Sequence, residues 1–228
     1  MKNEKVFFTE LAYVLGLIIL PLGAAFMEAA DFGLSMVVAP AYLLHLKLSQ
    51  IWPFFSFGMA EYVFQTGLLL LLVMVMRRFR WHFLLSIVTA VLYGIVLDFW
   101  IMLIAFMPDG IIAIRIFQFV IGLLLSALGV ALFFHTYLPP EVYELFVKTM
   151  SSKHNIVIHR FKTGYDCVSC IASIAMSFAF FGLWQFEGVK FGTIICALVN
   201  GPIIGVINRF MDNRWQFKDR LYLRKYFI

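Results

Sequence analysis

Six long apolar stretches are the feature that most constrains how this chain folds. A helix needs about 20 predominantly apolar residues to cross the hydrocarbon core of a bilayer. Only helices and closed barrels satisfy their backbone hydrogen bonds in lipid, and these stretches are too long and continuous for barrel strands. We therefore predict an all-α polytopic membrane protein with six transmembrane helices. The stretches cover roughly residues 8–30, 57–76, 81–106, 111–136, 164–183 and 189–210.

The composition agrees with a protein that faces lipid rather than water. The 228 residues are 63% hydrophobic and 14% charged, whereas a soluble domain is about half apolar and a quarter charged. The formal net charge of +5 does not predict nucleic-acid binding, because the basic residues cluster in short segments between the apolar stretches. Such clusters indicate membrane topology instead.

The distribution of lysine and arginine predicts the orientation. If the N-terminus is cytoplasmic, 15 of the 18 basic residues lie on the inner side, and only Lys47, Arg115 and Lys190 lie outside. This bias favours cytoplasmic placement of both termini. The first apolar stretch is longer than the core of a signal peptide and lacks a small-residue cleavage site, so we expect it to be retained as a span.

Two of the connections between the apolar stretches contain a short amphipathic piece. APAYLLHLKLS follows the first stretch and PPEVYELFVKTM follows the fourth. Each has proline within its first two residues, which suits the first turn of a helix, and both are too short to cross the bilayer. We predict interfacial or re-entrant helices, one on each side of the membrane.

The two halves of the chain resemble each other. LAYVLGLIILPLGAAF (11–26) aligns with FQFVIGLLLSALGVAL (117–132), the two amphipathic pieces align, Glu61 aligns with Asp166, and TAVLYG (89–94) aligns with CALVNG (196–201). Each half has three spans, so the second half enters the membrane from the opposite side, as in many secondary transporters. We therefore predict two inverted three-helix repeats, residues 1–107 and 108–211, followed by a basic cytoplasmic tail, residues 212–228.

The same segments resemble the bacterial YczE/YitT-type multi-pass membrane proteins. The resemblance rests on Ala29-Ala30-Asp31-Phe32-Gly33, Pro40, Leu138-Pro139-Pro140, YDCVSC and, above all, FGTIICALVNGPIIGVINRF (191–210). It covers most of the chain. It implies a protein of the bacterial cytoplasmic membrane that acts as a transporter or an accessory membrane protein, without settled catalytic residues.

Asp98 is the most unusual polar residue, because it lies within the apolar segment VLYGIVLDFWIML. It is about 12 Å from the outer end of its predicted span at 1.5 Å per residue. A charge at this depth costs about 2.5–3.5 kcal/mol even on the lenient insertion scale. We expect Asp98 to be protonated, to have a partner, or to face the bundle interior, in either a functional or a purely structural role.

Other polar residues are candidates for the same site. Glu28 and Glu61 lie toward the outer side with Asp98, and Arg115 could pair with Asp98 or Glu61 in an outward-opening cavity. Alternatively, the glutamates are hydrated at the headgroup level. On the inner side, Asp166 opens the fifth stretch, and Asn200 precedes a Gly-Pro pair that provides either free carbonyls for binding or a packed kink. The candidate substrate-binding or proton-coupling residues are Asp98, Glu61, Glu28, Arg115, Asn200 and Asp166.

No strong catalytic or metal-binding motif is present. The sequence lacks H-E-x-x-H, G-x-S-x-G and the phosphate-binding G-x-x-x-x-G-K-[ST], and the single C-x-x-C at Cys167 and Cys170 is more typical of helix packing than of a metal site. We therefore expect neither an enzyme nor a cofactor or metal site.

Three functions remain compatible with the sequence. The first is a transporter of a small cationic or zwitterionic solute through a polar cavity at the repeat interface. The second is a substrate-binding subunit of a larger import complex, and the third is a non-transport accessory protein. The expected partners are the lipid bilayer and a small-molecule solute, together with a second copy or a membrane partner subunit, and no nucleic acid.

Overall fold

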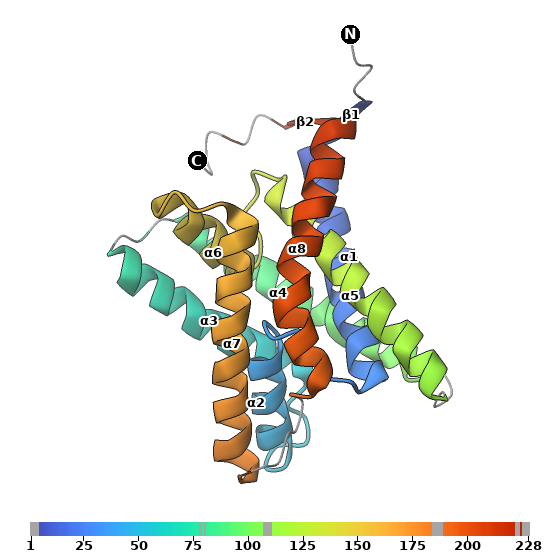
Figure 1. Ribbon diagram of the computed structural model, residues 1–228. Helices are drawn as coiled ribbons and strands as arrows, with labels where there is room; N and C mark the ends of the chain where they lie inside the picture. Colours follow the sequence, from blue (N-terminus) through green and yellow to red (C-terminus); the bar gives the residue numbers. More distant parts are fainter. Residues whose placement is uncertain are drawn as a thin grey trace.

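The computed structural model describes residues 5–77, 79, 81–106, 111–183, 189–221 and 224. These residues form eight helices and two short strands, so the predicted all-α fold is confirmed (Figure 1). The helices are α1 (Thr9–Ala30), α2 (Ala39–Ser49), α3 (Phe57–Met76), α4 (His82–Ile104), α5 (Ile112–Phe134), α6 (Val142–Lys153), α7 (Ile158–Phe181) and α8 (Phe191–Arg214). The strands are β1 (Lys5–Phe8) and β2 (Trp215–Lys218).

Six of these helices are long and apolar enough to cross a membrane, namely α1, α3, α4, α5, α7 and α8. They match the six predicted spans, and the protein is a polytopic membrane protein. Helix α7 begins at Ile158, six residues before the predicted start near 164. The polar start of α7 is helical because Lys162 and Asp166 are one turn apart and form an ion pair.

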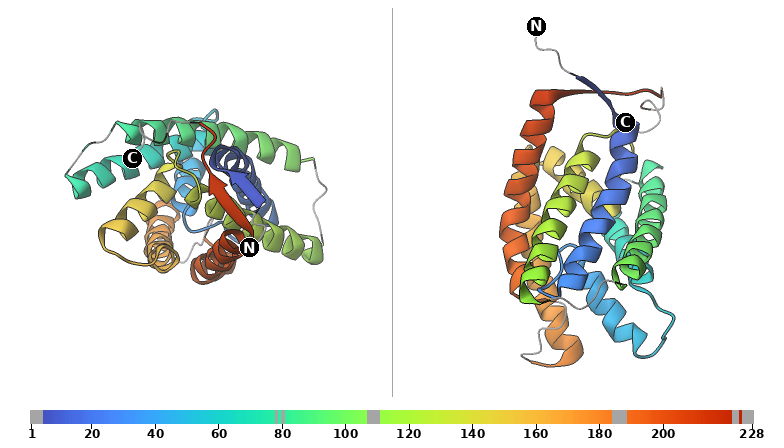
Figure 2. Two further views of the ribbon diagram at one scale, coloured as in Figure 1. Left: turned by 90° about the horizontal axis from the view of Figure 1, so that it is seen from above. Right: turned by 90° about the vertical axis from the view of Figure 1, so that its right-hand side faces the viewer.

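The long helices are arranged around a central pair, α1 and α5. Helices α4, α1, α5 and α8 stand side by side in one row (Figure 2, right). Helix α3 packs against α4 and α7 packs against α8. The short helices complete the second layer, since α2 contacts α3 and α7, and α6 likewise contacts α7 and α3.

Small residues allow the backbones of α1 and α5 to approach closely. Gly16 lies against Gly129 and Gly23 lies against Gly122, so the two helices run antiparallel. A Cβ atom on Gly23 would lie 2.6 Å from the backbone nitrogen of Ser126 and 2.7 Å from the carbonyl oxygen of Gly122. Glycine faces of this kind are typical of helix association in membranes, where close packing replaces the hydrophobic driving force.

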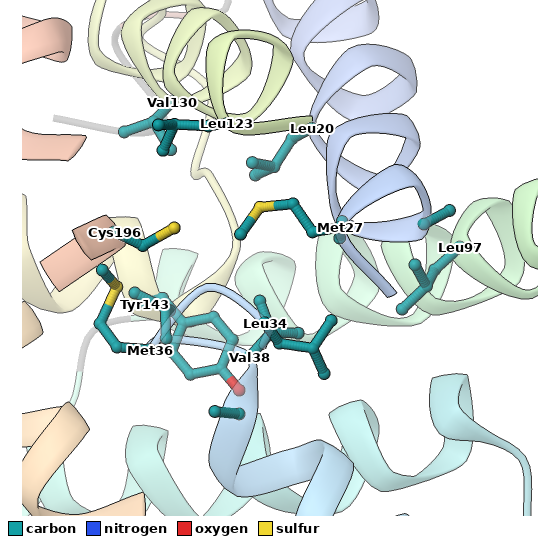
Figure 3. Packing of buried hydrophobic residues seen from close by; sticks show 14 of the residues in the cluster. Leu20, Met27, Leu34, Met36, Val38, Leu97, Leu123, Val130, Tyr143 and Cys196 are labelled. Atoms are coloured by element: carbon teal, nitrogen blue, oxygen red, sulfur yellow. The ribbon is translucent and has the colours of Figure 1, made fainter. Parts of the chain in front are cut away.

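Two irregular segments, residues 33–38 and 136–141, lead into the short helices and lie inside the protein. Most of their residues are buried, and Figure 3 shows Met36 and Val38 of the first beside the Tyr143 ring, just beyond the second. Irregular backbone is tolerated at membrane depth only where protein encloses it. This enclosure is what a re-entrant position of the two short helices would require.

The chain ends meet at one end of the bundle. Strand β1 pairs in parallel with β2, with Lys5 opposite Trp215. The Glu10 carboxylate accepts hydrogen bonds from the backbone N–H of Leu221 at 2.8 Å and from the Tyr137 hydroxyl at 3.0 Å. The sequence predicted only a basic cytoplasmic tail and did not reveal this strand pairing, because each strand is too short for a recognisable alternating pattern.

Candidate functional site

Eight polar side chains from α3, α6, α7 and α8 meet inside the protein, and we call this group the acid–lysine cluster. It contains four carboxyl groups, one ammonium group, two amides and one phenol. Every member is at most 3% exposed. The members are Glu61, Gln65, Glu141, Tyr143, Glu144, Lys162, Asp166 and Asn200.

Gln65 joins α3 to the start of α6. Its amide nitrogen donates to Glu61 at 3.2 Å and to Glu141 at 2.9 Å. Its carbonyl oxygen accepts from the backbone N–H of Val142 at 3.0 Å, and the Tyr143 hydroxyl donates to Glu61 at 3.1 Å. Gln65 therefore satisfies an N–H group that the first turn of α6 leaves without an intrahelical partner.

Lys162 provides the positive charge of the cluster. Its ammonium nitrogen lies 2.9 Å from Asp166 on the next turn of α7 and 3.7 Å from Glu144 of α6. Asn200 of α8 interacts with the Asp166 carboxylate. In the part of the chain that the structure describes, Lys162 is the one cationic side chain that forms an ion pair with any acid of the cluster.

The cluster has more acids than it can neutralise with its own lysine. With all four carboxyl groups ionised it would carry three uncompensated negative charges, and burying even one unpaired charge is prohibitive. Protons or a bound cation must supply the balance. Burial, reinforced by the neighbouring Glu144, raises the pKa of Glu141 well above its usual range, and burial also raises the pKa of Glu144.

A cavity of about 20 Å³ adjoins the cluster. Side chains of the cluster line one part of it, and side chains from α1, α4, α5 and the first irregular segment line the rest; the cluster members are Glu141, Tyr143, Glu144, Lys162 and Asn200. This volume is enough for one water-sized group. Glu144 Oε2 and Asn200 Oδ1 are buried and accept no hydrogen bond from any described residue, so the cavity borders on polar atoms with unused hydrogen-bonding capacity.

Three of the six predicted site residues, Glu61, Asp166 and Asn200, belong to this cluster. The other three do not, so the structure does not bring the predicted residues into a single site. The expected pairing of Arg115 with Asp98 or Glu61 is wrong. Arg115 instead binds the carboxylate of Asp31 at 3.0 Å, because the first turn of α5 lies beside the end of α1.

Glu28 lies at a separate small cavity of about 40 Å³ near the end of α1. Asp31 and Lys190 also line this cavity, and their side chains form an ion pair. Asp31 adopts a left-handed backbone conformation, with φ of 54°, as it terminates α1. Glu28 is half-buried at this end of the bundle and does not take part in the acid–lysine cluster.

Asp98 binds the start of a neighbouring helix. One carboxylate oxygen accepts from the Ser56 hydroxyl at 2.7 Å, and the other accepts from the backbone N–H of Gly58 at 2.9 Å. Ser56 in turn accepts from the backbone N–H of Met59 as the N-cap of α3. Asp98 therefore holds the first turn of α3 against α4, and the positive end of the α3 dipole favours its charge.

We expect Asp98→Ala to lower the free energy of unfolding by about 1–3 kcal/mol, because two hydrogen-bond donors at the start of α3 lose their acceptor. Asp98→Asn retains one acceptor oxygen and should cost less. Thermal unfolding of the purified protein in detergent measures both effects. An unchanged unfolding temperature for Asp98→Ala would argue against this structural role.

Glu141, Glu144 and Lys162 were not predicted as site residues, because they lie in a segment that the sequence predicts to be a cytoplasmic connection between two spans. Two signals were present. Glu141 and Glu144 are three residues apart in an amphipathic piece that follows two prolines, and Lys162 and Asp166 have the spacing of a helical ion pair. Neither signal distinguishes a surface position from a buried one until the segment is known to enter the protein.

Comparison with known proteins gives a family but no named relative. The searches of curated proteins and of solved structures returned no match. Residues 7–209 match the family of unknown function DUF6198, and this range includes every residue of the acid–lysine cluster. The chain therefore belongs to the DUF6198 family of unknown function.

Proposed function

We propose that this protein is a secondary transporter of a small cationic solute and that the acid–lysine cluster is its binding site. The observation that carries the proposal is the excess of buried carboxyl groups over cationic side chains around a cavity. Embedded ionisable groups of membrane proteins are costly and are typical of solute and proton pathways. A site with this excess attracts a cation and repels an anion.

We infer that the two halves form an inverted repeat, and such a repeat supports this function. At the α1–α5 crossing the contacts are reciprocal, since Gly16 meets Gly129 and Gly23 meets Gly122, and in the sequence alignment Gly16 corresponds to Gly122 and Gly23 to Gly129. A two-fold axis requires such an exchange of contacts. Glu61 and Asp166 are likewise equivalent positions, and both belong to the cluster. We infer that the site lies at the interface of two inverted halves, as in many transporters.

The same proposal includes the cellular location. We infer that both termini are cytoplasmic, that the protein resides in a bacterial cytoplasmic membrane, and that the chain is related to the YczE/YitT-type proteins that it resembles. The distribution of lysine and arginine supports the orientation. Labelling of single cysteines introduced at Lys47 and at Lys153 with a membrane-impermeant reagent tests it, with labelling from outside expected only at residue 47.

Lys162 indicates the chemical class of the solute. A primary ammonium group already lies between Asp166 and Glu144, so the cluster has the acceptor groups that such a cation needs. The cavity has room for one water-sized group, and its remaining wall includes Leu20, Val38 and Val130. This combination favours ammonium, for which methylammonium serves as the radiolabelled analogue.

Uptake of radiolabelled methylammonium into proteoliposomes tests the proposal. We expect Glu144→Gln to reduce uptake about tenfold or more, because each buried charge partner contributes strongly to binding of an opposite charge. Asp212→Asn is the matched control, since Asp212 is 65% exposed and pairs with His135 outside the cluster, and it should retain uptake. Wild-type uptake no faster than that of empty liposomes would overturn the proposal.

A further inference from the structure

We propose that Glu141 and Glu144 share one proton and release it when the cationic solute binds, so that the protein exchanges the solute for a proton. This inference rests on the proposed function and adds the coupling ion. It starts from the position of two acids at the beginning of α6, where Glu141 is the N-cap residue and Glu144 lies one turn further. Both are 2% exposed.

The closeness of these two acids favours a shared proton. They are three residues apart at the start of α6, both are buried, and both line the same cavity. Two ionised carboxylates so close together in a buried site repel each other, so one of the two holds a proton. The amino-terminal end of α6 favours one negative charge at the same place. The pair therefore holds one proton and one negative charge, a common state for two carboxyl groups that share a site.

The groups that surround the pair come from several elements of the fold. Gln65 donates to Glu141 from α3 at 2.9 Å, and Lys162 approaches Glu144 from α7 at 3.7 Å but lies closer to Asp166. From α1, α5 and residues 33–38, only apolar and hydroxyl side chains line the adjoining cavity. The titratable groups that act on the pair from the surrounding elements are Tyr13, Glu61, Tyr93, Tyr143, Lys162, Tyr165 and Asp166.

Charge balance then couples the two ligands. Glu141 and Glu144 both line the cavity, so a cation that enters it lies beside the pair. A cation and the proton at the same two carboxyl groups would repel each other across a short distance in a buried site, which is costly. Departure of the proton as the cation arrives leaves the total charge unchanged. The solute and the proton thus occupy the site alternately. Each transport cycle moves the solute across the membrane in one direction and a proton in the other.

Titration calorimetry of the purified protein with methylammonium chloride, in two buffers of different ionisation enthalpy, measures the protons released. For the wild-type protein we expect about one proton per bound cation and an apparent affinity that falls about tenfold per pH unit on the acidic side. Glu141→Gln replaces the shared proton with a fixed amide hydrogen and should abolish both the release and the pH dependence. Glu28→Gln, outside the cluster, should retain both.

The outcomes separate the two proposals. Saturable binding of methylammonium with no proton release would overturn the coupling and leave the proposed function standing. Absence of both binding and proteoliposome uptake would overturn the proposed function and the coupling with it. If Glu141→Gln does not fold, Glu144→Gln provides the second test, since it also removes an ionisable member of the pair and should show the same loss of proton release.

Discussion

Lys162→Met should lower the free energy of unfolding by about 3–5 kcal/mol, because removal of one partner from a buried ion pair leaves the other charge uncompensated. Lys162 is 1% exposed and Asp166 is fully buried, so water cannot replace the lost interaction. Equilibrium unfolding in detergent micelles, followed by circular dichroism, measures the change. We expect the single variant to unfold at much milder conditions than the wild-type protein.

The double variant Lys162→Met/Asp166→Asn is the control for this effect. It removes the stranded charge as well as the lysine, so most of the lost stability should return. The two substitutions should be strongly non-additive in a double-mutant cycle, as expected for directly interacting groups. Equal stability of the single and double variants would mean that the charge on Asp166 is not what makes the loss of Lys162 costly.

Gly23→Leu should cost about 3 kcal/mol, at the upper end of the range for overpacked sites. A Cβ atom at position 23 would lie 2.6 Å from the backbone nitrogen of Ser126 and 2.7 Å from the carbonyl oxygen of Gly122. Backbone atoms cannot rotate away, so α1 and α5 would have to separate. Because Leu20 and Ser126 line the cavity beside the acid–lysine cluster, methylammonium uptake should fall together with the unfolding temperature.

Gly67→Leu is the matched control, on α3 in a similarly apolar helix. No atom lies within 4 Å of a Cβ atom built at this position, so the new side chain would extend into open space. Replacement of a helical glycine should be neutral or stabilise the helix by up to about 1 kcal/mol. A comparable loss of stability for both variants would contradict close packing at the α1–α5 crossing as the cause.

The spans and the two short helices could be predicted because each depends on a short, continuous piece of sequence. The length of an apolar stretch is compared with the thickness of a bilayer, and neither quantity depends on the rest of the fold. The two amphipathic pieces were recognised as helices for the same reason. The boundary of one span differed from the prediction, since α7 begins before the apolar stretch, near the ion pair that Lys162 forms.

The site was harder to predict because its members are far apart in the sequence. Asp98 was prominent in an apolar stretch, yet its two acceptor oxygens are occupied by the start of α3. Glu141 and Glu144 were not prominent, because their segment contains enough polar residues to read as a connection. The apolar context of Asp98 therefore made it prominent in the sequence, and the polar context of Glu141 and Glu144 made them inconspicuous.

What the sequence by itself determined was the all-α membrane fold, the number of spans, the positions of the short helices and the likeness of the two halves. These features follow from hydrophobic length and from local residue order. Tertiary structure alone decided which acids meet, since the burial of residues 136–141 carries Glu141 and Glu144 to Lys162. The physical reason is that the partner of a buried charge is set by the packing of separate helices, and no local pattern contains that information.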